Sequence, residues 1–315
     1  MTPSAAAPSA SPVVVVTGAN GLVGARVCAA LTERGASVRA VVRRAGSAPV
    51  LDGLTEHVGD FRDPVLAAAV VQGADAVVST VHPMGADRAT QQRVAVEGTP
   101  RLARAARDAG VARFVHVSTF AVYARRSGAD DVDETSALVD DDADVYPVTK
   151  RDTDAALADV EGITRVLVRP PAILGAGSTS VWNTLRPARM RDDEQQRRTN
   201  PSGTFAWVHL DDLAALVADV AAGLVPEAAD AADGPVAGGC TAVDVAGEPA
   251  TTRDYVGTVS AALGLEPVWD EDLPAWTGQV STGRARGWGW RPAVSLEQAL
   301  AELAEGVAAV ERSGA

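Results

Sequence analysis

The 315-residue sequence has few residues of several types, and each shortage excludes a class of protein. It has only two cysteines, Cys28 and Cys240, which cannot form a disulfide framework and which favour a reducing, cytoplasmic setting. No apolar run approaches the roughly 18 residues that a membrane span needs. Acidic residues (41) outnumber basic residues (28), and the net charge of -13 excludes a nucleic-acid binder.

The N-terminal segment 1–12 also lacks the parts of a targeting signal. It is rich in Ala, Ser and Pro but has neither a basic region nor a long apolar stretch. We expect a disordered lead-in rather than a signal peptide. Hydrophobic residues make up 47% of the chain, which is enough for a large core.

Short apolar segments alternate with helical patterns along the first half of the chain. The apolar patterns predict buried strands at 13–16, 38–42, 76–81, 114–118 and 165–169. They also predict one long helix over 89–109. This alternation predicts an α/β fold with a doubly wound parallel sheet of the Rossmann type. We expect residues 13–170 to form the dinucleotide-binding core. Residues 171–315 are expected to form mostly a small C-terminal substrate-binding lobe, with segments near 205–222 returning to the core.

Three glycines lie directly after the first predicted strand, where a helix begins. Gly18, Gly21 and Gly24 form a G-x-x-G-x-x-G array. Glycine lets the backbone turn tightly and approach a pyrophosphate, and the N–H groups at a helix N-terminus attract the anion. The context of strand, glycine loop and helix predicts a dinucleotide site.

The end of the second predicted strand indicates which dinucleotide is bound. An acidic residue there would accept hydrogen bonds from an adenosine ribose, but this chain has Arg43 and Arg44. A guanidinium pairs well with a 2′-phosphate. We therefore expect NADP in preference to NAD, with a solvated arginine pair as the alternative.

The chain has a single lysine, Lys150, among 28 basic residues. It follows Tyr146 by four residues in the segment YPVTK (146–150), and residues four apart lie on one face of a helix. A nearby ammonium lowers the pKa of a phenol, and its compact donors differ from those of a guanidinium. This pairing indicates a functional role rather than a solvated helix face.

Several ordered motifs together resemble one family. They are TGANGLVG (17–24), GDFRD (59–63), VEGT (96–99), FVHVSTFAVY (114–123), YPVTK (146–150), VRPPAILGAG (168–177), WVHLDDLA (207–214) and GWRP (289–292). The sequence resembles an extended or atypical short-chain dehydrogenase/reductase, the group often labelled NAD-dependent epimerase/dehydratase. The resemblance covers residues 13–303.

That resemblance implies roles for individual residues. Tyr146 is expected to be the general acid/base, Lys150 to bind the nicotinamide ribose and lower the pKa of Tyr146, and Thr119 to hydrogen-bond the substrate oxygen, with Ser118 assisting. The expected cofactor contacts, with Arg43 and Arg44 added, are Gly18, Asn20, Gly21, Leu22, Val23, Gly24, Asp60, Phe61, Ser79, Thr80, Val81, Lys150, Pro170 and Ile173. Substrate contacts are expected from His82, Tyr123 and Arg191.

Departures from the family pattern reduce the number of reaction types that the chain is expected to catalyse. Phe120 and Ala121 stand where dehydratases carry Asp-Glu, which argues against dehydration, and Ala172 replaces an asparagine usual in sugar-nucleotide epimerases. We expect an NAD(P)-dependent oxidoreductase acting on a ketone or secondary alcohol of a small metabolite. The alternatives are an NAD-dependent sugar-nucleotide epimerase and a non-catalytic cofactor-binding protein. The segment around His209 resembles a metal cluster, but no metal is expected; a homodimer is possible.

Overall fold

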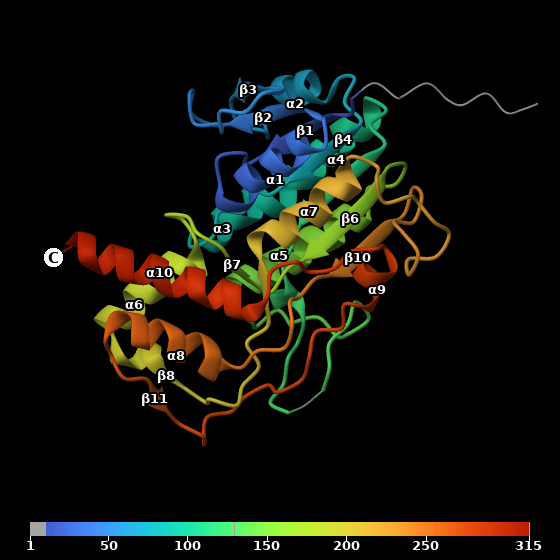
Figure 1. Ribbon diagram of the computed structural model, residues 1–315. Coiled ribbons are helices and arrows are strands. Elements are labelled where there is room, and N and C mark those ends of the chain that lie inside the picture. The colour runs from blue at the N-terminus through green and yellow to red at the C-terminus, as the bar shows by residue number, and fades with distance from the viewer. Residues whose placement is uncertain (1–10, 129, 315) are drawn as a thin grey trace, which may run out of the picture.

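A seven-stranded parallel sheet forms the centre of the molecule, as the sequence predicts (Figure 1). The structure is a computed structural model that describes residues 11–128 and 130–314, so most of the expected lead-in lies outside the described residues. The strand order is β10-β6-β5-β4-β1-β2-β3. The strands are β1 (Val13–Thr17), β2 (Ser37–Val42), β3 (Leu54–Val58), β4 (Ala76–Ser79), β5 (Arg113–Val117), β6 (Thr164–Arg169) and β10 (Cys240–Asp244).

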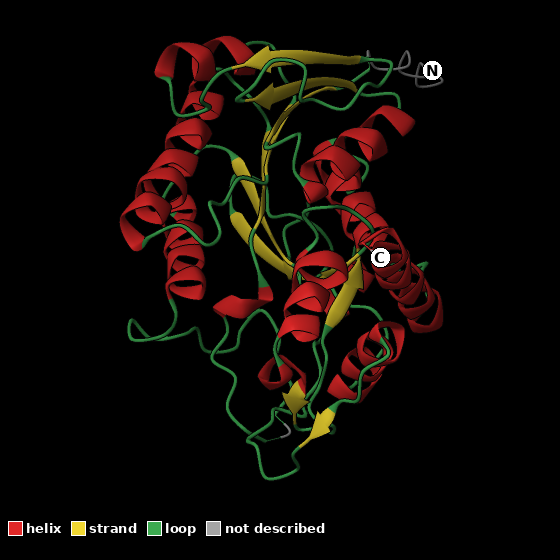
Figure 2. Ribbon diagram, turned by 90° about the vertical axis from the view of Figure 1, so that its left-hand side faces the viewer, coloured by secondary structure: helices red, strands yellow, loops and turns green. Residues whose placement is uncertain are grey.

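Helices cover both faces of this sheet (Figure 2). One face packs against α1 (Leu22–Glu33) and α7 (Leu210–Ala221). The other packs against α2 (Pro64–Val71), α4 (Gly98–Asp108) and α5 (Val145–Ala158). The valine run of β1 explains this arrangement, because Val14 and Val16 contribute to the first core cluster and Val15 to the second. A strand buried on both faces needs apolar side chains at every position.

The predicted long helix over 89–109 is wrong in one respect. The segment divides into α3 (Arg88–Gln91), a π-helical turn (Gln92–Glu97) and α4. Pro100 lies in the first turn of α4 and has no N–H to donate to the carbonyl four residues earlier, so a regular α-helix cannot run through this point. The π-helical turn accommodates the missing backbone hydrogen bond at the proline.

The second half of the chain builds a smaller lobe below the sheet in Figure 1. Its core joins the two-stranded pair β7 (Ala172–Leu174) and β9 (Trp207–His209) to α6 (Arg186–Asp192), α8 (Thr252–Leu263) and α10 (Leu296–Gly314). Smaller elements are β8 (Arg198–Thr199), β11 (Val268–Trp269), α9 (Gly283–Gly287) and short helical turns at Phe120–Val122, Val181–Leu185 and Glu194–Arg197. A capping box at Thr251 and Asp254 begins α8, and Gly264 ends it with a φ of 68°.

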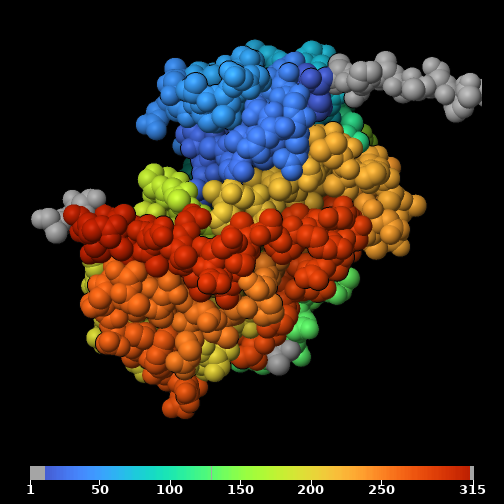
Figure 3. All heavy atoms as spheres, viewed as in Figure 1, coloured from blue at the N-terminus to red at the C-terminus, as the bar shows by residue number. Residues whose placement is uncertain are grey.

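Two segments of the second half belong to the central sheet rather than to the lobe. Helix α7 packs its apolar face on α1, and β10 adds an edge strand beside β6. The sequence predicts the return of α7 but not that of β10. Helix α10 lies along the boundary between the two parts of the molecule, where it forms the left-hand part of the red band in Figure 3. Within the described residues, no helix combines the length and apolar character needed to cross a bilayer.

Candidate active site

Helix α5 presents three polar side chains on one face. Tyr146, Lys150 and Asp154 follow one another at intervals of four residues, so they line up along the helix. Lys150 and Asp154 are each 3% exposed, whereas Tyr146 is only partly buried. This face therefore runs from the buried interior at Asp154 towards the accessible end at Tyr146.

Tyr146 lies beside Thr119, which is expected from the sequence to hydrogen-bond the substrate oxygen. A side-chain hydrogen bond from Thr119 favours the phenolate, but burial outweighs it and raises the pKa of Tyr146 above its usual value. Thr119 itself precedes a short helical turn, and its Oγ1 accepts a hydrogen bond of 3.2 Å from the backbone N–H of Ala121. Tyr146 is thus a protonated phenol beside a second hydroxyl.

Lys150 is fully enclosed and donates a hydrogen bond of 2.7 Å to the backbone carbonyl of Val117, at the end of β5. Burial lowers the pKa of Lys150 to about 8, and the charge of Asp154 opposes this effect. The expectation that Lys150 lowers the pKa of Tyr146 is not met in this structure. The largest influence on the phenol is its own burial, and the pKa of Tyr146 is raised.

A buried polar network continues from Asp154 beneath the site. Asp154 pairs with Arg169 at 3.0 Å, and Arg169 donates a hydrogen bond of 2.7 Å to the Tyr123 hydroxyl. Tyr123 in turn donates to Asp244 at 3.0 Å. The hydroxyl of Tyr123 is therefore bonded to buried residues and is not free to bind substrate. Tyr123 nevertheless borders the cavity described below. Ser118 lies beside Asp154, whose pKa it lowers, so the structure places it deeper than Thr119.

His82 lies next to the phenol, in the loop after β4. The rings of His82 and Tyr146 meet edge to face, with centroids 5.1 Å apart. The Nε2 atom of His82 is 2.9 Å from Oε1 of Gln91, and Thr149 donates a hydrogen bond of 2.8 Å to the same oxygen. Burial and the nearby charge of Lys150 lower the pKa of His82 to about 4, so the ring is neutral.

Tyr146 opens onto a cavity of about 820 Å³ between the sheet and the small lobe. The sheet side contributes Ala121, Tyr123, Arg125 and the acidic loop that ends at Asp144, and the lobe side contributes segments near Thr199, Thr252 and Trp276. Arg191 is not among the lining residues; it is exposed and pairs with Asp192 and Glu311. The structure thus does not bring Arg191 to this cavity, and the sequence reasoning missed Arg125.

The glycine loop has the close packing that a dinucleotide site requires. Gly18 has a φ of 74°, and a Cβ on Gly24 would lie 2.1 Å from the carbonyl oxygen of Gly18. Gly21 is the N-cap of α1 and provides no side-chain hydrogen bond, so the first N–H groups of the helix face the loop. These features fit the pyrophosphate of a dinucleotide.

The predicted adenosine end lies at the carboxyl ends of β2 and β3. Arg43 and Arg44 are exposed there, and the charge of Arg43 contributes to lowering the pKa of Asp60. The main cause of that shift is the hydrogen bonding of Arg62 to the Asp60 carboxylate. The exposed Arg43 and Arg44 thus lie at the strand end where the ribose is expected, and Arg62 is paired with Asp60. Phe61 is buried in the core cluster of the second sheet face.

The remaining expected cofactor contacts lie on neighbouring strand ends. Thr80 packs on the glycine loop, because its Oγ1 donates a hydrogen bond of 2.9 Å to the carbonyl of Thr17. Ser79 is fully buried, and its hydroxyl has no hydrogen-bond partner in the described part of the chain. On the other side, Leu22 contacts the loop after β7, since a Cβ on Gly177 would lie 2.6 Å from its Cδ1. Of the others, Asn20 is exposed, and Val23 and Val81 are partly buried. Pro170 directly follows β6, and Ile173 lies in β7.

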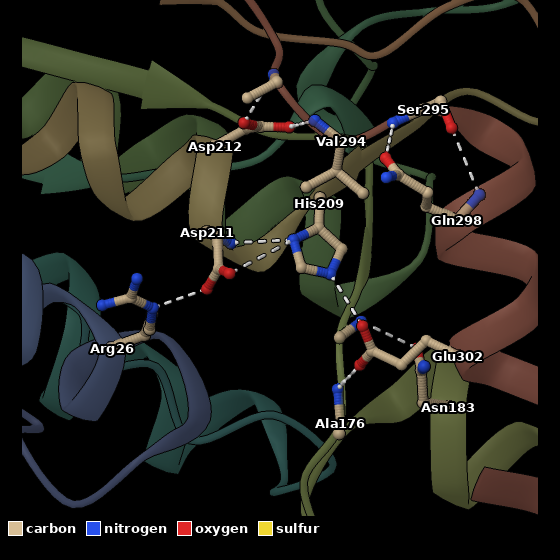
Figure 4. A network of polar contacts seen from close by, with 12 residues as sticks. Arg26, Ala176, Asn183, His209, Asp211, Asp212, Val294, Ser295, Gln298 and Glu302 are labelled. Atoms are coloured by element: carbon tan, nitrogen blue, oxygen red, sulfur yellow. Dashed lines mark hydrogen bonds and ion pairs between the residues drawn. The ribbon is translucent and has the colours of Figure 1, made fainter. Parts of the chain in front are cut away.

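His209 belongs to a separate network that joins the lobe to the core (Figure 4). Its Nε2 lies 3.1 Å from Glu302 on α10, and its Nδ1 accepts the backbone N–H of Asp211 at the start of α7. Glu302 also accepts the backbone N–H of Ala176 at 2.7 Å. Asp212 points elsewhere and accepts the N–H of Ala293. These residues have structural partners, and no group able to hold a metal ion occurs in the described residues.

Comparison with known proteins identifies the family. The model of the NAD dependent epimerase/dehydratase family matches residues 14–226. The chain belongs to this family. A 4-hydroxy-2-methyl-3-oxo-4-farnesyl-3,4-dihydroquinoline-1-oxide ketoreductase from Stigmatella aurantiaca is 36% identical over 191 residues, which is 56% of either chain. The family member described here thus spans little more than half the length of that relative.

Two further similarities extend over more of the chain. A 3-diazoavenalumate denitrifying reductase from a Streptomyces species is 28% identical over 309 residues, 89% of this chain and 95% of the relative. The solved UDP-glucuronic acid 4-epimerase from Bacillus cereus, in complex with NAD, superposes with a TM-score of 0.73 and 19% identity. It covers 95% of this family member and 99% of that structure, and it supports the fold.

Proposed function

We propose that the protein is an NADP-dependent oxidoreductase that reduces a ketone, or oxidises a secondary alcohol, on a small molecule. The observation that carries this proposal is the protonated Tyr146, hydrogen-bonded to Thr119, at the wall of an 820 Å³ cavity. A phenol, whose ordinary pKa is about 10, is protonated at neutral pH and can give its proton to a substrate oxygen placed beside it. The similarity to a ketoreductase and to a denitrifying reductase supports a reductive role.

Each residue of the site has its own role in this reaction. A bound nicotinamide dinucleotide supplies the hydride chemistry. Tyr146 gives its proton to the carbonyl oxygen or takes one from the alcohol, and Thr119 donates a hydrogen bond to that same oxygen. Lys150 would hold the nicotinamide ribose, and its bond to the Val117 carbonyl keeps the ammonium in place. The small lobe closes the far side of the cavity and binds the substrate.

The cofactor preference rests on the exposed arginines after β2. Arg43 and Arg44 replace the carboxylate that would hydrogen-bond an unmodified ribose, and their charge favours the 2′-phosphate of NADP. The NAD in the solved epimerase belongs to that protein. A homodimer and a cytoplasmic location stay predictions from the sequence.

A sugar-nucleotide epimerase is the second candidate, favoured by the fold similarity to a UDP-glucuronic acid 4-epimerase. The lining of the cavity disfavours it. Asp140, Asp142 and Asp144 all border the cavity, and a nucleoside diphosphate would bring further negative charge beside them. An enzyme that reduces a less charged compound fits this lining better.

Replacing Tyr146 with Phe tests the proposal. We expect NADPH-dependent reduction of simple aryl ketones to fall by about 100-fold or more, because the proton donor is lost, while NADPH binding is retained. Tyr255→Phe is the matched control, because the Tyr255 hydroxyl bonds the Trp182 carbonyl within the lobe, away from the Tyr146 hydroxyl. Unchanged turnover in Tyr146→Phe would refute the mechanism. Tightly retained NAD with no net oxidation or reduction would favour the epimerase, and cofactor binding without any turnover would favour a binding protein.

A further inference from the structure

Arg125 is a cation in the wall of the cavity that the reaction outlined above does not use. It follows the short helical turn Phe120–Val122 and lines the same cavity as Tyr146. The turn is fixed to the sheet, because Phe120 donates its N–H to the carbonyl of Pro170 at 2.8 Å. Arg125 therefore projects from a segment anchored beside the catalytic pair Thr119 and Tyr146.

Two aromatic rings hold the guanidinium group in place. The guanidinium carbon of Arg125 lies 5.1 Å from the centroid of the Phe120 ring and 5.8 Å from that of Trp276. The two rings also contact each other, with centroids 5.8 Å apart. Cation–π contacts leave the N–H donors at the edge of the guanidinium plane available for another partner.

Arg125 forms no ion pair with a carboxylate among the described residues, although aspartates border the same cavity. The surrounding protein atoms lower its pKa by desolvation, and no acidic side chain contributes an opposing effect. The other arginine of the cavity differs in this respect, because Arg198 pairs with Asp270 at 2.5 Å. Arg125 is exposed to the cavity and forms no ion pair within the described part of the chain, so its free N–H donors can bind an anion there.

The rest of the lining limits how much negative charge that anion can carry. Asp140, Asp142 and Asp144 border the same cavity, and one guanidinium offsets only one negative charge. A phosphate dianion or a diphosphate would leave charge uncompensated beside these carboxylates. A single carboxylate matches both the charge of Arg125 and the planar, bidentate geometry of its donors.

We propose that Arg125 is the anion-binding residue of the substrate pocket and that the substrate is a carbonyl compound or secondary alcohol bearing one carboxylate. This inference rests on the proposed function, because it takes the reacting oxygen to lie at Tyr146. The carboxylate accepts two N–H bonds from Arg125, and the rings of Phe120 and Trp276 keep the guanidinium aimed into the cavity.

Binding of matched acid and amide pairs tests this assignment. The probes are 2-oxo-2-phenylacetate, 4-oxo-4-phenylbutanoate and 5-oxo-5-phenylpentanoate, each with its primary amide, titrated calorimetrically into the full chain saturated with NADP⁺. At least one acid is expected to bind about tenfold or more tightly than its amide. Arg125→Gln removes this difference, whereas Arg126→Gln keeps it, because the adjacent Arg126 is also exposed but does not line the cavity. Phenacyl phosphate is expected to bind more weakly than the best acid.

Three results would overturn the assignment: equal affinity of acid and amide in every pair, an acid preference that survives in Arg125→Gln, or no binding by any probe. Tighter binding of phenacyl phosphate would overturn the limit of one negative charge. Failure of the proposed function gives a different signature. In that case Tyr146→Phe would not change the rate of ketone reduction, or no ketone would be reduced, whatever the ratio of acid to amide affinity.

Discussion

The His82 ring meets the Tyr146 ring edge to face, at an interplanar angle of 87°. The opposite edge of His82 is tied to Gln91, which also donates a hydrogen bond of 2.8 Å to the carbonyl of Ala86. Because Oε1 of Gln91 is an acceptor, Nε2 of His82 carries the proton, and Nδ1 is a buried acceptor without a partner in the residues that the structure covers. The phenol is thus held in place by a histidine outside the proposed catalytic motif.

We expect His82→Ala to reduce kcat by about tenfold, because Tyr146 loses the ring that orients it. His82→Phe restores the ring contact and should recover most of kcat. The pKa of His82 is lowered to about 4, so the ring stays neutral from about pH 5 upwards and adds no step to the kcat profile near pH 6.5. Profiles of kcat against pH for the wild type and His82→Phe check this. A wild-type step near pH 6.5 that His82→Phe abolishes would contradict it.

Lys150→Arg should lower turnover by at least about 100-fold although the charge is kept. Lys150 is 3% exposed, and its ammonium reaches the Val117 carbonyl at 2.7 Å, so a larger planar group cannot take the same position. Single-turnover rates with NADPH measure the effect. Arg104→Lys, on the exposed face of α4, is the control for the arginine–lysine exchange itself. Wild-type rates for Lys150→Arg would show that the ammonium does not anchor the ribose.

Arg43→Asp should weaken the binding of NADPH by about tenfold or more and leave NADH binding little changed. The substitution removes a charge that would pair with the 2′-phosphate and restores a carboxylate that accepts ribose hydroxyls. Dissociation constants from fluorescence titration of both cofactors check this. Equal losses for the two would indicate that Arg43 does not face the 2′ position.

Gly24→Ala should destabilise the fold by about 1–3 kcal/mol and abolish measurable cofactor binding. The new Cβ would lie 2.1 Å from the Gly18 oxygen, so the loop and α1 must separate. Chemical unfolding and NADPH titration measure both effects. Gly257→Ala is the matched control, because it lies within α8 with no atom within 4 Å of the added Cβ, and it should stabilise by about 0.5–1 kcal/mol. A Gly24→Ala protein that binds NADPH normally would exclude tight packing as the role of this glycine.

Asp244→Asn should change the free energy of unfolding, relative to the wild type, in a way that depends on pH. The difference, variant minus wild type, should be larger at pH 8 than at pH 5 by at least about 1 kcal/mol. Burial and the charge of Glu134 raise the pKa of Asp244 to about 8, against about 3.9 in an unfolded chain. The folded wild type therefore holds the extra proton between these values and loses stability as pH rises through that window. Asparagine has no such titration and still accepts the Tyr123 hydroxyl. Urea unfolding at both pH values checks this, with the exposed Asp233→Asn as control; a pH-independent difference would contradict it.

The sequence predicted the sheet well because β1 is a continuous valine run and β2 and β5 are rich in valine, with glycine or a loop after each strand. It missed β10, whose segment CTAVD is short and flanked by glycines and has no periodic signal of its own. Its pairing with β6 supplies the order that local sequence does not. The break in the helix before Pro100 was also missed, although the proline was a visible signal.

In the site, the spacing of Tyr146 and Lys150 correctly predicted that both lie on one helical face. It did not predict that burial dominates the pKa of the phenol, because desolvation depends on what the fold places around it. Arg125 was missed for a related reason. Its neighbour Trp276 is 151 residues away in the chain, and only the folded lobe brings that ring to the guanidinium.

The edge strand β10 has a consequence for how the polypeptide matures. Helix α7 and β10 lie more than 30 residues beyond the last strand of the N-terminal half, yet they cover α1 and complete the sheet beside β6. A nascent chain that has emerged only as far as residue 170 has an apolar flank with nothing to cover it. The dinucleotide-binding core therefore finishes folding only after Asp244 has emerged from the ribosome. Fragments that end before this residue are expected to aggregate.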